Sequence, residues 1–327
     1  MRIRIFPRLV NRKDQDPGLF IHLEGARDAL LVDCGTLDGI PKIDLLRISH
    51  VFVTHTHIDH FCGFDRLLRL ILGEVATVTV FGPIGITANV MGKLAGYTWN
   101  LIDEEGPIFT VKELAGDRMT VTRLRCRKGF RPEGTPTEEP VTGGLIVSDG
   151  RVKIRHAVLE HQIPSLAFSI QEEPYASIRP DRIRSLGLKE GPWLKRLQDR
   201  VLAGSIGDEP FDADGATRPL AELVDQIVQL KPGRKVTYVS DTIFNDSVCE
   251  TVAELARDSD DFFCEANYQD EDLDKARAYF HLTARQAGLL AARSHVKRLI
   301  LYHISRKYHG DIRTSIQQAA EEFGRVE

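Results

Sequence analysis

One short segment of the chain concentrates residue types that bind metal ions. Residues 54–60 hold three imidazoles and one carboxylate, those of His55, His57, Asp59 and His60. The apolar run at residues 51–53 precedes the segment and predicts a buried β-strand. Histidine and carboxylate ligands together suit Zn²⁺, Mn²⁺ or Fe, and one carboxylate can lie between two such ions. The segment therefore indicates metal-dependent chemistry.

Three more candidate ligands lie far from this segment in the sequence. His161, Asp241 and His303 come at or near the ends of predicted strands, and strand ends lead into the loops that often carry functional residues. His55 and His57 are two residues apart, so on an extended segment their side chains face the same side. A lone His-x-His pair is weak evidence, but seven candidate ligands could hold two ions. Two ions would lower the pKa of a bound water toward ~7 and stabilise charge on an attacked phosphoryl or carbonyl group.

The composition is that of an ordinary globular protein. Of 327 residues, 42% are apolar and 28% are charged, and the net charge of −4 gives no overall attraction to nucleic acid. The length fits two average domains or one large α/β domain. The five cysteines form no CxxC pair, which argues against a disulfide framework. Without a recognisable signal peptide or membrane-spanning apolar run, we expect a cytoplasmic protein that makes no membrane contact.

The expected strands and helices fall into two groups. In the first half, strands are expected at residues 2–6, 18–23, 29–33, 51–54 and 75–81, with helices at 64–72 and 84–95. Residues 111–163 favour strands, interrupted by a loop at 129–144. Further strands are expected at 236–240, 261–265 and 299–302, with helices at 283–294 and 313–323. This order predicts two packed sheets covered by helices on both outer faces.

The candidate ligands and their flanking residues resemble the metallo-β-lactamase superfamily, and within it the ribonuclease Z-like branch. Residues 55–60 match the metal motif, and residues 30–35 and 80–83 are similar to segments that flank it. The third-histidine, bridging-aspartate and His-Ser-Thr-Ala segments resemble residues 159–168, 240–242 and 281–284. His303 matches the last ligand, and Cys264 stands in place of the first residue of a His-Glu-Ala segment.

This resemblance implies an α/β (α+β) fold, a four-layer αββα sandwich formed as a single domain over residues 1–327. It also divides the ligands between two divalent ions. The implied sets are His55, His57 and His161 for one ion, Asp59, His60 and His303 for the other, and Asp241 as the bridge. Zn²⁺ is the expected metal, with Mn²⁺ or Fe as alternatives.

Three residues receive further roles from the resemblance. His281 would lie beside the substrate phosphate and assist catalysis, unless it is only part of the cap of the following helix. Asp59 would share in proton transfer with the bound water. Glu265 would orient an imidazole by a hydrogen bond, unless it is simply a buried, paired acid.

An inserted arm is expected at residues 174–218, where RNA-processing members of the branch carry a segment that grips tRNA. Between residues 176 and 200 there are seven Lys and Arg residues and three acidic residues, and such an excess suits a phosphate backbone. The arm residues expected to contact RNA are Arg182, Arg184, Lys189, Lys195 and Arg196. The alternative is a solvated insertion without RNA contact.

Three departures from the branch's pattern leave the substrate open. Residues 6–12 contain no glycine-rich loop, residues 36–39 lack the Glu-Gly-Thr-Gln of tRNA-processing members, and residues 61–66 differ from the usual Gly-Leu-Pro-Gly. The leading hypothesis is a homodimeric phosphodiesterase that cuts 3′ trailers from precursor tRNA with a metal-bound hydroxide. Alternatives are a phosphodiesterase for small or cyclic nucleotides, another hydrolase of the same fold, and a binding protein that has lost catalysis.

Overall fold

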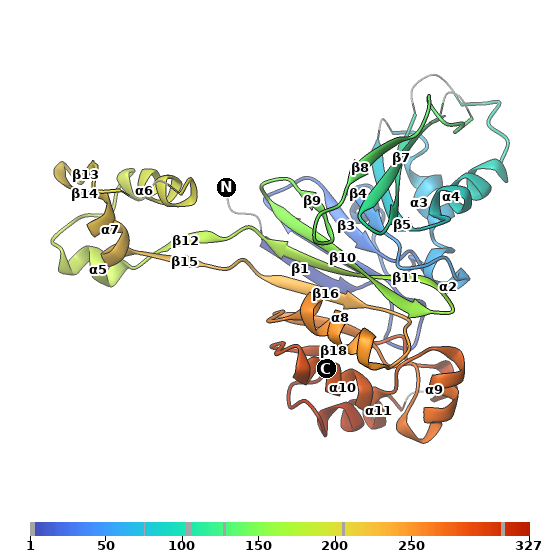
Figure 1. Ribbon diagram of the computed structural model, residues 1–327. Coiled ribbons are helices and arrows are strands. Elements are labelled where there is room, and N and C mark those ends of the chain that lie inside the picture. Colours follow the sequence, from blue (N-terminus) through green and yellow to red (C-terminus); the bar gives the residue numbers. More distant parts are fainter. Residues whose placement is uncertain (1–3, 75, 103–105, 127–128, 205–206, 309–310) are drawn as a thin grey trace. The chain divides into compact units, whose positions relative to one another are not determined.

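The computed structural model divides the chain into two compact units. The structure describes residues 4–327 except 75, 103–105, 127–128, 205–206 and 309–310 (Figure 1). The first unit comprises residues 4–171 and 234–327, and the second comprises residues 172–233. The candidate metal ligands all lie in the first unit, whereas the candidate RNA-binding residues lie in the second.

Two β-sheets form the centre of the first unit. Among the described residues, the larger sheet has the strand order β1-β2-β3-β4-β5-β6-β7-β8. Its strands are β1 Arg4–Leu9, β2 Leu19–Glu24, β3 Ala29–Val32, β4 Ile48–Phe52, β5 Thr77–Pro83, β6 Ile108–Ala115, β7 Arg118–Arg125 and β8 Thr137–Pro140. The smaller sheet has the order β18-β17-β16-β11-β10-β9. Its strands are β9 Leu145–Ser148, β10 Val152–His161, β11 Ile163–Glu172, β16 Lys235–Val239, β17 Asp261–Glu265 and β18 Leu299–Tyr302.

Parallel strands bring the loops that carry the site to one edge of each sheet. Strands β3 to β6 run parallel to one another in the larger sheet. Strands β16, β17 and β18 run parallel in the smaller sheet. The carboxyl ends of parallel strands meet at the same sheet edge, where open α/β sheets place their ligands. The loops after β16, β17 and β18 therefore begin side by side.

Alternating side chains place the apolar core on both faces of each sheet. In β3, Leu30 and Val32 join the core between the two sheets, whereas Leu31 joins the core beneath the outer helices. In β18, Ile300 packs between the sheets and Leu301 packs under the helices. Because these strands are buried on both faces, their sequences are the unbroken apolar runs that predicted them.

Helices cover the outer face of each sheet (Figure 1). Helices α1 (Lys42–Leu45), α3 (Phe64–Ile71) and α4 (Ile86–Ala95) pack on the larger sheet. Helices α8 (Asp246–Ala256), α10 (Ala284–Arg293) and α11 (Ile312–Ala320) pack on the smaller one. The short α2 (Ile58–Phe61) carries two candidate ligands, and α9 (Leu273–Tyr279) precedes His281. The predicted four-layer αββα sandwich is confirmed.

Several predicted elements differ from the observed ones, for identifiable reasons. The loop expected at residues 129–144 contains β8, whose Thr-Glu-Glu-Pro sequence has no apolar signal and which is a strand through its pairing with β7. The helix expected from Thr283 begins at Ala284, because Thr283 is its N-cap and exchanges hydrogen bonds with Gln286. Parts of the strands expected at 2–6 and 75–81 fall on residues outside the described ones.

The second unit has a small core of its own. Strand β12 (Tyr175–Ile178) pairs with β15 (Val228–Lys231), and β13 (Pro210–Ala213) pairs with β14 (Ala216–Pro219). Helices α5 (Pro180–Ser185), α6 (Trp193–Leu202) and α7 (Leu220–Ile227) enclose a cluster that includes Trp193, Leu197 and Leu223. The unit extends beyond the expected residues 174–218 because β15, near its end, is the partner of β12, near its start.

Within the part of the chain that the structure describes, no helix is long and apolar enough to span a lipid bilayer.

Two backbone hydrogen bonds fasten the metal-motif segment to the chain after β3. Cys34 N donates to His60 O and Gly63 N donates to Cys34 O, both at 2.8 Å. This close approach requires glycine at position 63. A Cβ atom there would overlap the carbonyl oxygen of Gly35 and press on the side chain of Leu37.

We predict that Gly63→Ala lowers the free energy of unfolding by about 1–3 kcal/mol, as for other additions to a filled core. Urea unfolding followed by circular dichroism measures the change. Gly92→Ala is the matched control, because a Cβ on this α4 glycine meets nothing within 4 Å. It should stabilise the protein by about 0.4–1 kcal/mol. Equal destabilisation by both variants would contradict the proposed clash.

Candidate metal centre

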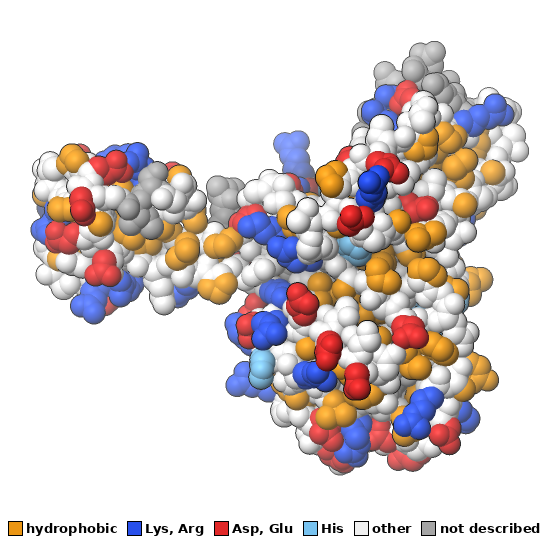
Figure 2. Space-filling model, viewed as in Figure 1, with side chains coloured by type: hydrophobic (Ala, Val, Ile, Leu, Met, Phe, Trp, Pro, Cys, Tyr) orange, Lys and Arg blue, Asp and Glu red, His pale blue; other side chains and the backbone are white. Residues whose placement is uncertain are grey.

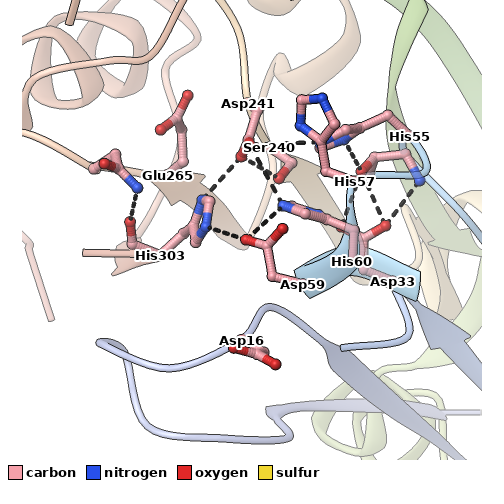
Figure 3. Close-up of polar contacts among 12 residues, drawn as sticks. Asp16, Asp33, His55, His57, Asp59, His60, Ser240, Asp241, Glu265 and His303 are labelled. Atoms are coloured by element: carbon pink, nitrogen blue, oxygen red, sulfur yellow. Dashed lines mark hydrogen bonds and ion pairs between the residues drawn. The ribbon is translucent and has the colours of Figure 1, made fainter. Parts of the chain in front are cut away.

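The candidate ligands come from segments far apart in the sequence and lie together in the structure; Figure 3 labels all of them except His161. His55, His57, Asp59 and His60 follow β4, and His161 ends β10. Asp241 follows β16 and His303 follows β18. The sheet edges described above thus supply all seven predicted ligands to one place.

One group consists of His55, His57, His161 and Asp241, whose ligand atoms lie within 4.8 Å of one another. His57 Nδ1 is 3.1 Å from His55 Nε2 and 3.4 Å from His161 Nε2. Asp241 Oδ2 is 3.6 Å from each of those Nε2 atoms. Four donors at about 2.0–2.1 Å from a tetrahedral ion lie roughly 3.3 Å from one another. The spacing therefore fits an ion such as Zn²⁺.

The second group consists of Asp59, His60 and His303, also within 4.8 Å of one another. Asp59 Oδ2 is 3.1 Å from His303 Nε2 and 3.6 Å from His60 Nε2. Asp241 reaches this group as well, because its Oδ2 is 3.4 Å from His60 Nε2 and its Oδ1 is 2.9 Å from His303 Nδ1. Asp241 therefore stands where a carboxylate bridging two ions would stand.

A buried ring nitrogen supports the fit to a cation. His60 Nε2 is buried and forms no hydrogen bond of good geometry among the described residues, although Asp241 Oδ2 and Asp59 Oδ2 lie 3.4 and 3.6 Å from it. Positive charge is favoured at this atom, and a metal ion bound there would supply it in place of a proton. The donor set fits two divalent ions and leaves Zn²⁺, Mn²⁺ and Fe as possible choices.

Asp33 holds the metal-motif segment in place, and the sequence did not single it out. Its carboxylate is fully buried and accepts hydrogen bonds from Thr54 N (2.8 Å), Thr54 Oγ1 (2.9 Å) and Tyr238 Oη (3.1 Å). Asp33 Oδ2 also lies 2.9 Å from His60 Nδ1. Because Nδ1 is engaged, His60 presents Nε2 to the second group. In the sequence, the feature that could have identified Asp33 is its position, because this acidic residue directly follows an apolar strand.

Other contacts orient the ligands of the first group. His161 Nδ1 lies 2.7 Å from the carbonyl oxygen of Phe280, which directs His161 Nε2 toward Asp241. His55 Nδ1 lies 3.0 Å from Thr54 Oγ1. Each contact fixes which nitrogen faces the site, as is usual for metal-binding histidines.

Left-handed backbone conformations flank the centre. Asp33, Gln162, Phe280 and His303 have φ values of 55°, 51°, 56° and 56°. Such conformations cost residues other than glycine about 1–3 kcal/mol each and persist where the surrounding structure holds them. At these positions, the chain turns sharply to direct side chains or carbonyl groups into the site.

Glu265 contacts His281 and none of the candidate ligands at hydrogen-bond distance among the described residues. Glu265 Oε2 lies 2.9 Å from His281 Nδ1, and Oε1 accepts from the backbone N–H groups of Thr242 and Leu282. Burial lowers the pKa of His281, but the Glu265 carboxylate outweighs burial and the pKa is raised. The His281 ring lies 5.2 Å from that of His161, between centroids. His281 is therefore oriented, and favoured as a cation, at the border of the metal centre.

The ligand imidazoles differ in their affinity for protons. Burial, aided by repulsion from His60, lowers the pKa of His55 to about 2, and burial also lowers the pKa of His57. Both rings are therefore neutral, as metal binding requires. Burial also disfavours a charge on His60, but Asp241 and Asp33 raise its pKa to about 10. A metal ion must displace a proton at that position.

A pocket of about 570 Å³ adjoins the second ligand group. Asp59 and His303 line it, together with residues 14–16 from the loop after β1 and residues 304–306 from the loop after β18. The exposed side chain of Ile58 forms part of its rim. The metal centre is therefore accessible from a cavity large enough for part of a nucleotide-sized molecule.

Comparisons with known proteins agree with this fold. A family model described as the metallo-beta-lactamase superfamily matches residues 16–78. Ribonuclease Z from Bacillus cereus (strain AH187) is 30% identical over 313 residues, which covers 93% of this chain and 88% of that protein. Ribonuclease Z from Deinococcus radiodurans is 28% identical over 282 residues, which covers 85% and 83%. The solved structure of human tRNase Z, short form, is similar with a TM-score of 0.54 and 18% identity, and covers 94% of each chain.

We predict that Asp33→Asn weakens the binding of Zn²⁺ or Mn²⁺ about 10–100-fold, the usual effect of removing a group that orients a metal-binding histidine. Competition with a chromophoric chelator measures affinity without relying on activity. Asp38→Asn is the control, because that carboxylate is largely exposed and pairs with Arg66. Unchanged affinity in a folded Asp33→Asn protein would show that His60 needs no such support.

Proposed function

The chain belongs to the metallo-β-lactamase superfamily, in its ribonuclease Z-like branch, and from this membership we propose that it removes the 3′ trailer from precursor tRNA. Membership makes the protein a metal-dependent hydrolase of the phosphodiesterase type. One observation carries the more specific proposal: two ligand groups share Asp241 beside the oriented pair of Glu265 and His281. This arrangement suits in-line cleavage of a phosphodiester better than hydrolysis of an uncharged amide.

Two residues of the chain carry the proton transfers in this proposal: Asp59 acts on the attacking water and His281 on the departing oxygen. Two divalent ions, held by the seven candidate ligands, would supply a nucleophile at neutral pH and neutralise charge on the phosphoryl group. The Asp59 side chain is partly exposed and lines the pocket, so its carboxylate can exchange a proton with the attacking water. Burial raises the pKa of Asp59, but the hydrogen bond from His303 and the neighbouring imidazoles hold it well below its usual range. Asp59 therefore remains ionised, and as a weak base it would pass on a proton rather than keep it.

His281 serves the departing oxygen in this proposal. Glu265 engages Nδ1 and leaves Nε2 for the substrate. Because the pKa of His281 is raised, the imidazolium form is favoured and can donate a proton as the P–O bond breaks. Glu265 is fully buried and receives two further backbone hydrogen bonds, so the pair keeps its geometry.

Ion pairs within the arm, residues 172–233, reduce its capacity to bind an RNA phosphate backbone. These residues include nine Lys and Arg and eleven Asp and Glu. Figure 2 shows acidic and basic side chains interspersed on the visible face of the arm. The ion pairs join Arg196 with Asp212, Arg200 with Glu209, Lys195 with Asp199, Arg182 with Asp181, and Arg218 with Glu222. Glu209 and Asp212 thus pair with the α6 cations Arg200 and Arg196. The count over residues 176–200 in the sequence leaves these two acids out and so overstates the positive charge of the arm.

Arg184 and Lys189 keep the phosphate-binding role in this proposal. Neither forms an ion pair with a carboxylate among the described residues. The excess of acids elsewhere in the arm favours a second candidate function, hydrolysis of small or cyclic phosphodiesters. Such substrates need no extended basic surface, whereas precursor tRNA gains much of its affinity from one.

The metal, the location and the assembly follow from the same proposal. Zn²⁺ is the proposed metal, because three imidazoles and a carboxylate at tetrahedral spacing suit it. All five cysteines are free thiols, which agrees with the cytoplasmic location proposed here. Homodimer formation stays a prediction from the resemblance.

The test is a paired cleavage assay with Zn²⁺ or Mn²⁺. The substrates are a 3′-extended precursor tRNA and bis-p-nitrophenyl phosphate, and His57→Ala is the control. We expect both substrates to be cleaved, the tRNA at its 3′ trailer, with activity reduced at least about 100-fold in the control because one ligand is lost. Cleavage of the small diester alone would favour the second candidate function. Failure on both with metal bound would direct the search to carboxyl-type substrates.

A second prediction concerns how the arm affects the salt dependence of KM for precursor tRNA. Arg184→Ala combined with Lys189→Ala should raise KM for precursor tRNA and reduce the slope of log KM against log salt by about one to two, since each lost phosphate contact contributes roughly 0.7–0.9. Hydrolysis of bis-p-nitrophenyl phosphate should not change. The matched control is Arg196→Ala with Arg200→Ala, which removes two cations already paired within the arm. A larger salt effect in the control pair would contradict the assignment.

A further inference from the structure

An arginine lines the pocket beside the second ligand group. Arg306 lies three residues after His303 and shares the 570 Å³ pocket with Asp59 and His303. Its side chain is 71% exposed, so most of its guanidinium donors face solvent. Guanidinium groups bind phosphate through two parallel hydrogen bonds. Arg306 is therefore a cation placed next to the reaction centre but outside the ligand set.

One carboxylate fixes the direction of this arginine. Arg306 Nη2 donates to Asp16 Oδ1 at 2.7 Å. This contact joins residues 290 positions apart in the sequence and uses one of five guanidinium N–H groups. The remaining donors stay available to a second anion. Asp16 thus holds Arg306 without saturating it.

Asp16 itself is firmly placed. Its side chain is only 13% exposed, and Thr36 N lies 3.4 Å from Asp16 Oδ2. The backbone of Gly35 approaches so closely that a Cβ at position 35 would press on the Asp16 side chain. In Figure 3, Asp16 lies on the same side of the centre as Asp59. The loop that carries Asp16 is the one that has no glycine-rich sequence.

We propose that Arg306, positioned by Asp16, binds a second phosphate group of the substrate, adjacent to the phosphate that is cleaved. The proposal rests on the proposed phosphodiesterase function and specifies its substrate class, namely phosphodiesters that carry a further phosphate one nucleoside away. Each acid of the pocket has a cationic or metal-site partner: Arg12 lies 3.2 Å from Asp14, Arg306 pairs with Asp16, and Asp59 belongs to the second ligand group with His303. A diester with a single phosphate would leave Arg306 unused.

Two matched chromogenic substrates test the proposal. Thymidine 5′-(p-nitrophenyl phosphate) has one phosphate, and its 3′-phosphorylated form has a second at the neighbouring position. In both, water adds to the 5′-phosphorus and the bond to the p-nitrophenol oxygen breaks, so only the second phosphate differs. We expect the wild-type protein to prefer the 3′-phosphorylated substrate about 10–100-fold in kcat/KM, as a charged hydrogen-bonded pair provides.

Substitutions test whether this substrate preference depends on Arg306 and Asp16. Arg306→Ala should abolish the preference by raising KM for the 3′-phosphorylated substrate, and Arg306→Lys should restore part of it. Asp16→Asn should give an intermediate preference, since the amide can still accept a hydrogen bond. Arg313→Ala, which removes an exposed arginine of α11 that does not line the pocket, is the control. Circular dichroism of each variant confirms folding.

The outcomes separate this proposal from the function on which it rests. Absence of the preference in the wild type, or its persistence in Arg306→Ala, would overturn the role of Arg306. Failure to cleave precursor tRNA while the preference and its loss are observed would reject only the tRNA substrate. If neither diester is hydrolysed, calorimetric titration of the metal-loaded proteins with thymidine 3′,5′-bisphosphate makes the same comparison. Equal affinity in wild type and Arg306→Ala would then reject the proposal.

Discussion

The buried carboxylate of Asp33 is the interaction on which the centre depends. It joins three elements: the end of β3, the segment after β4 through Thr54 and His60, and β16 through Tyr238. An isolated charge in such a place would be very costly, and it persists only because hydrogen bonds satisfy it. Tyr238 belongs to the smaller sheet, so one carboxylate connects both sheets at the edge where the ligands meet. The same carboxylate therefore supports both the packing of the two sheets and the orientation of His60.

The same geometry makes the centre unfavourable without a cation. Asp241 and the imidazoles around it crowd acceptor atoms within 4.8 Å, and carboxylates hold a proton on His60. In a low-dielectric interior, such carboxylates need positive charge beside them, and protonated imidazoles supply it when no metal ion is bound. Metal binding would replace those protons, and its free energy would add to the stability of the fold. Strained residues such as Phe280 and His303 are tolerable in this setting because many contacts hold them.

Local patterns in the sequence predicted some of this, and long-range contacts account for the rest. The spacing of His55 and His57 follows from the strand period, and the double-sided burial of β18 follows from its unbroken apolar run. Positions at the ends of predicted strands indicated His161 and Asp241 as further candidate ligands, but only the family resemblance divided the ligands between two ions. Asp33 was not singled out because a buried acid resembles any turn residue in a single sequence. The acids at residues 209–212 were not weighed against the cations of α6 because their pairing arises only when the arm folds.

The distribution of charge determines how this protein can distinguish its substrates. The net charge is −4 and the arm has more acids than bases, so neither provides the long-range field that steers polyanions to a surface. Exposed ion pairs such as that between Arg196 and Asp212 contribute little and are screened by salt. On the proposals made above, attraction for phosphate comes from a few separate places: the metal centre, Arg306 in the adjoining pocket, and Arg184 and Lys189 in the arm. Selection under these conditions depends on where a substrate places its phosphates and only weakly on how many it carries. A small diester with correctly spaced phosphates could therefore compete with a much larger nucleic acid.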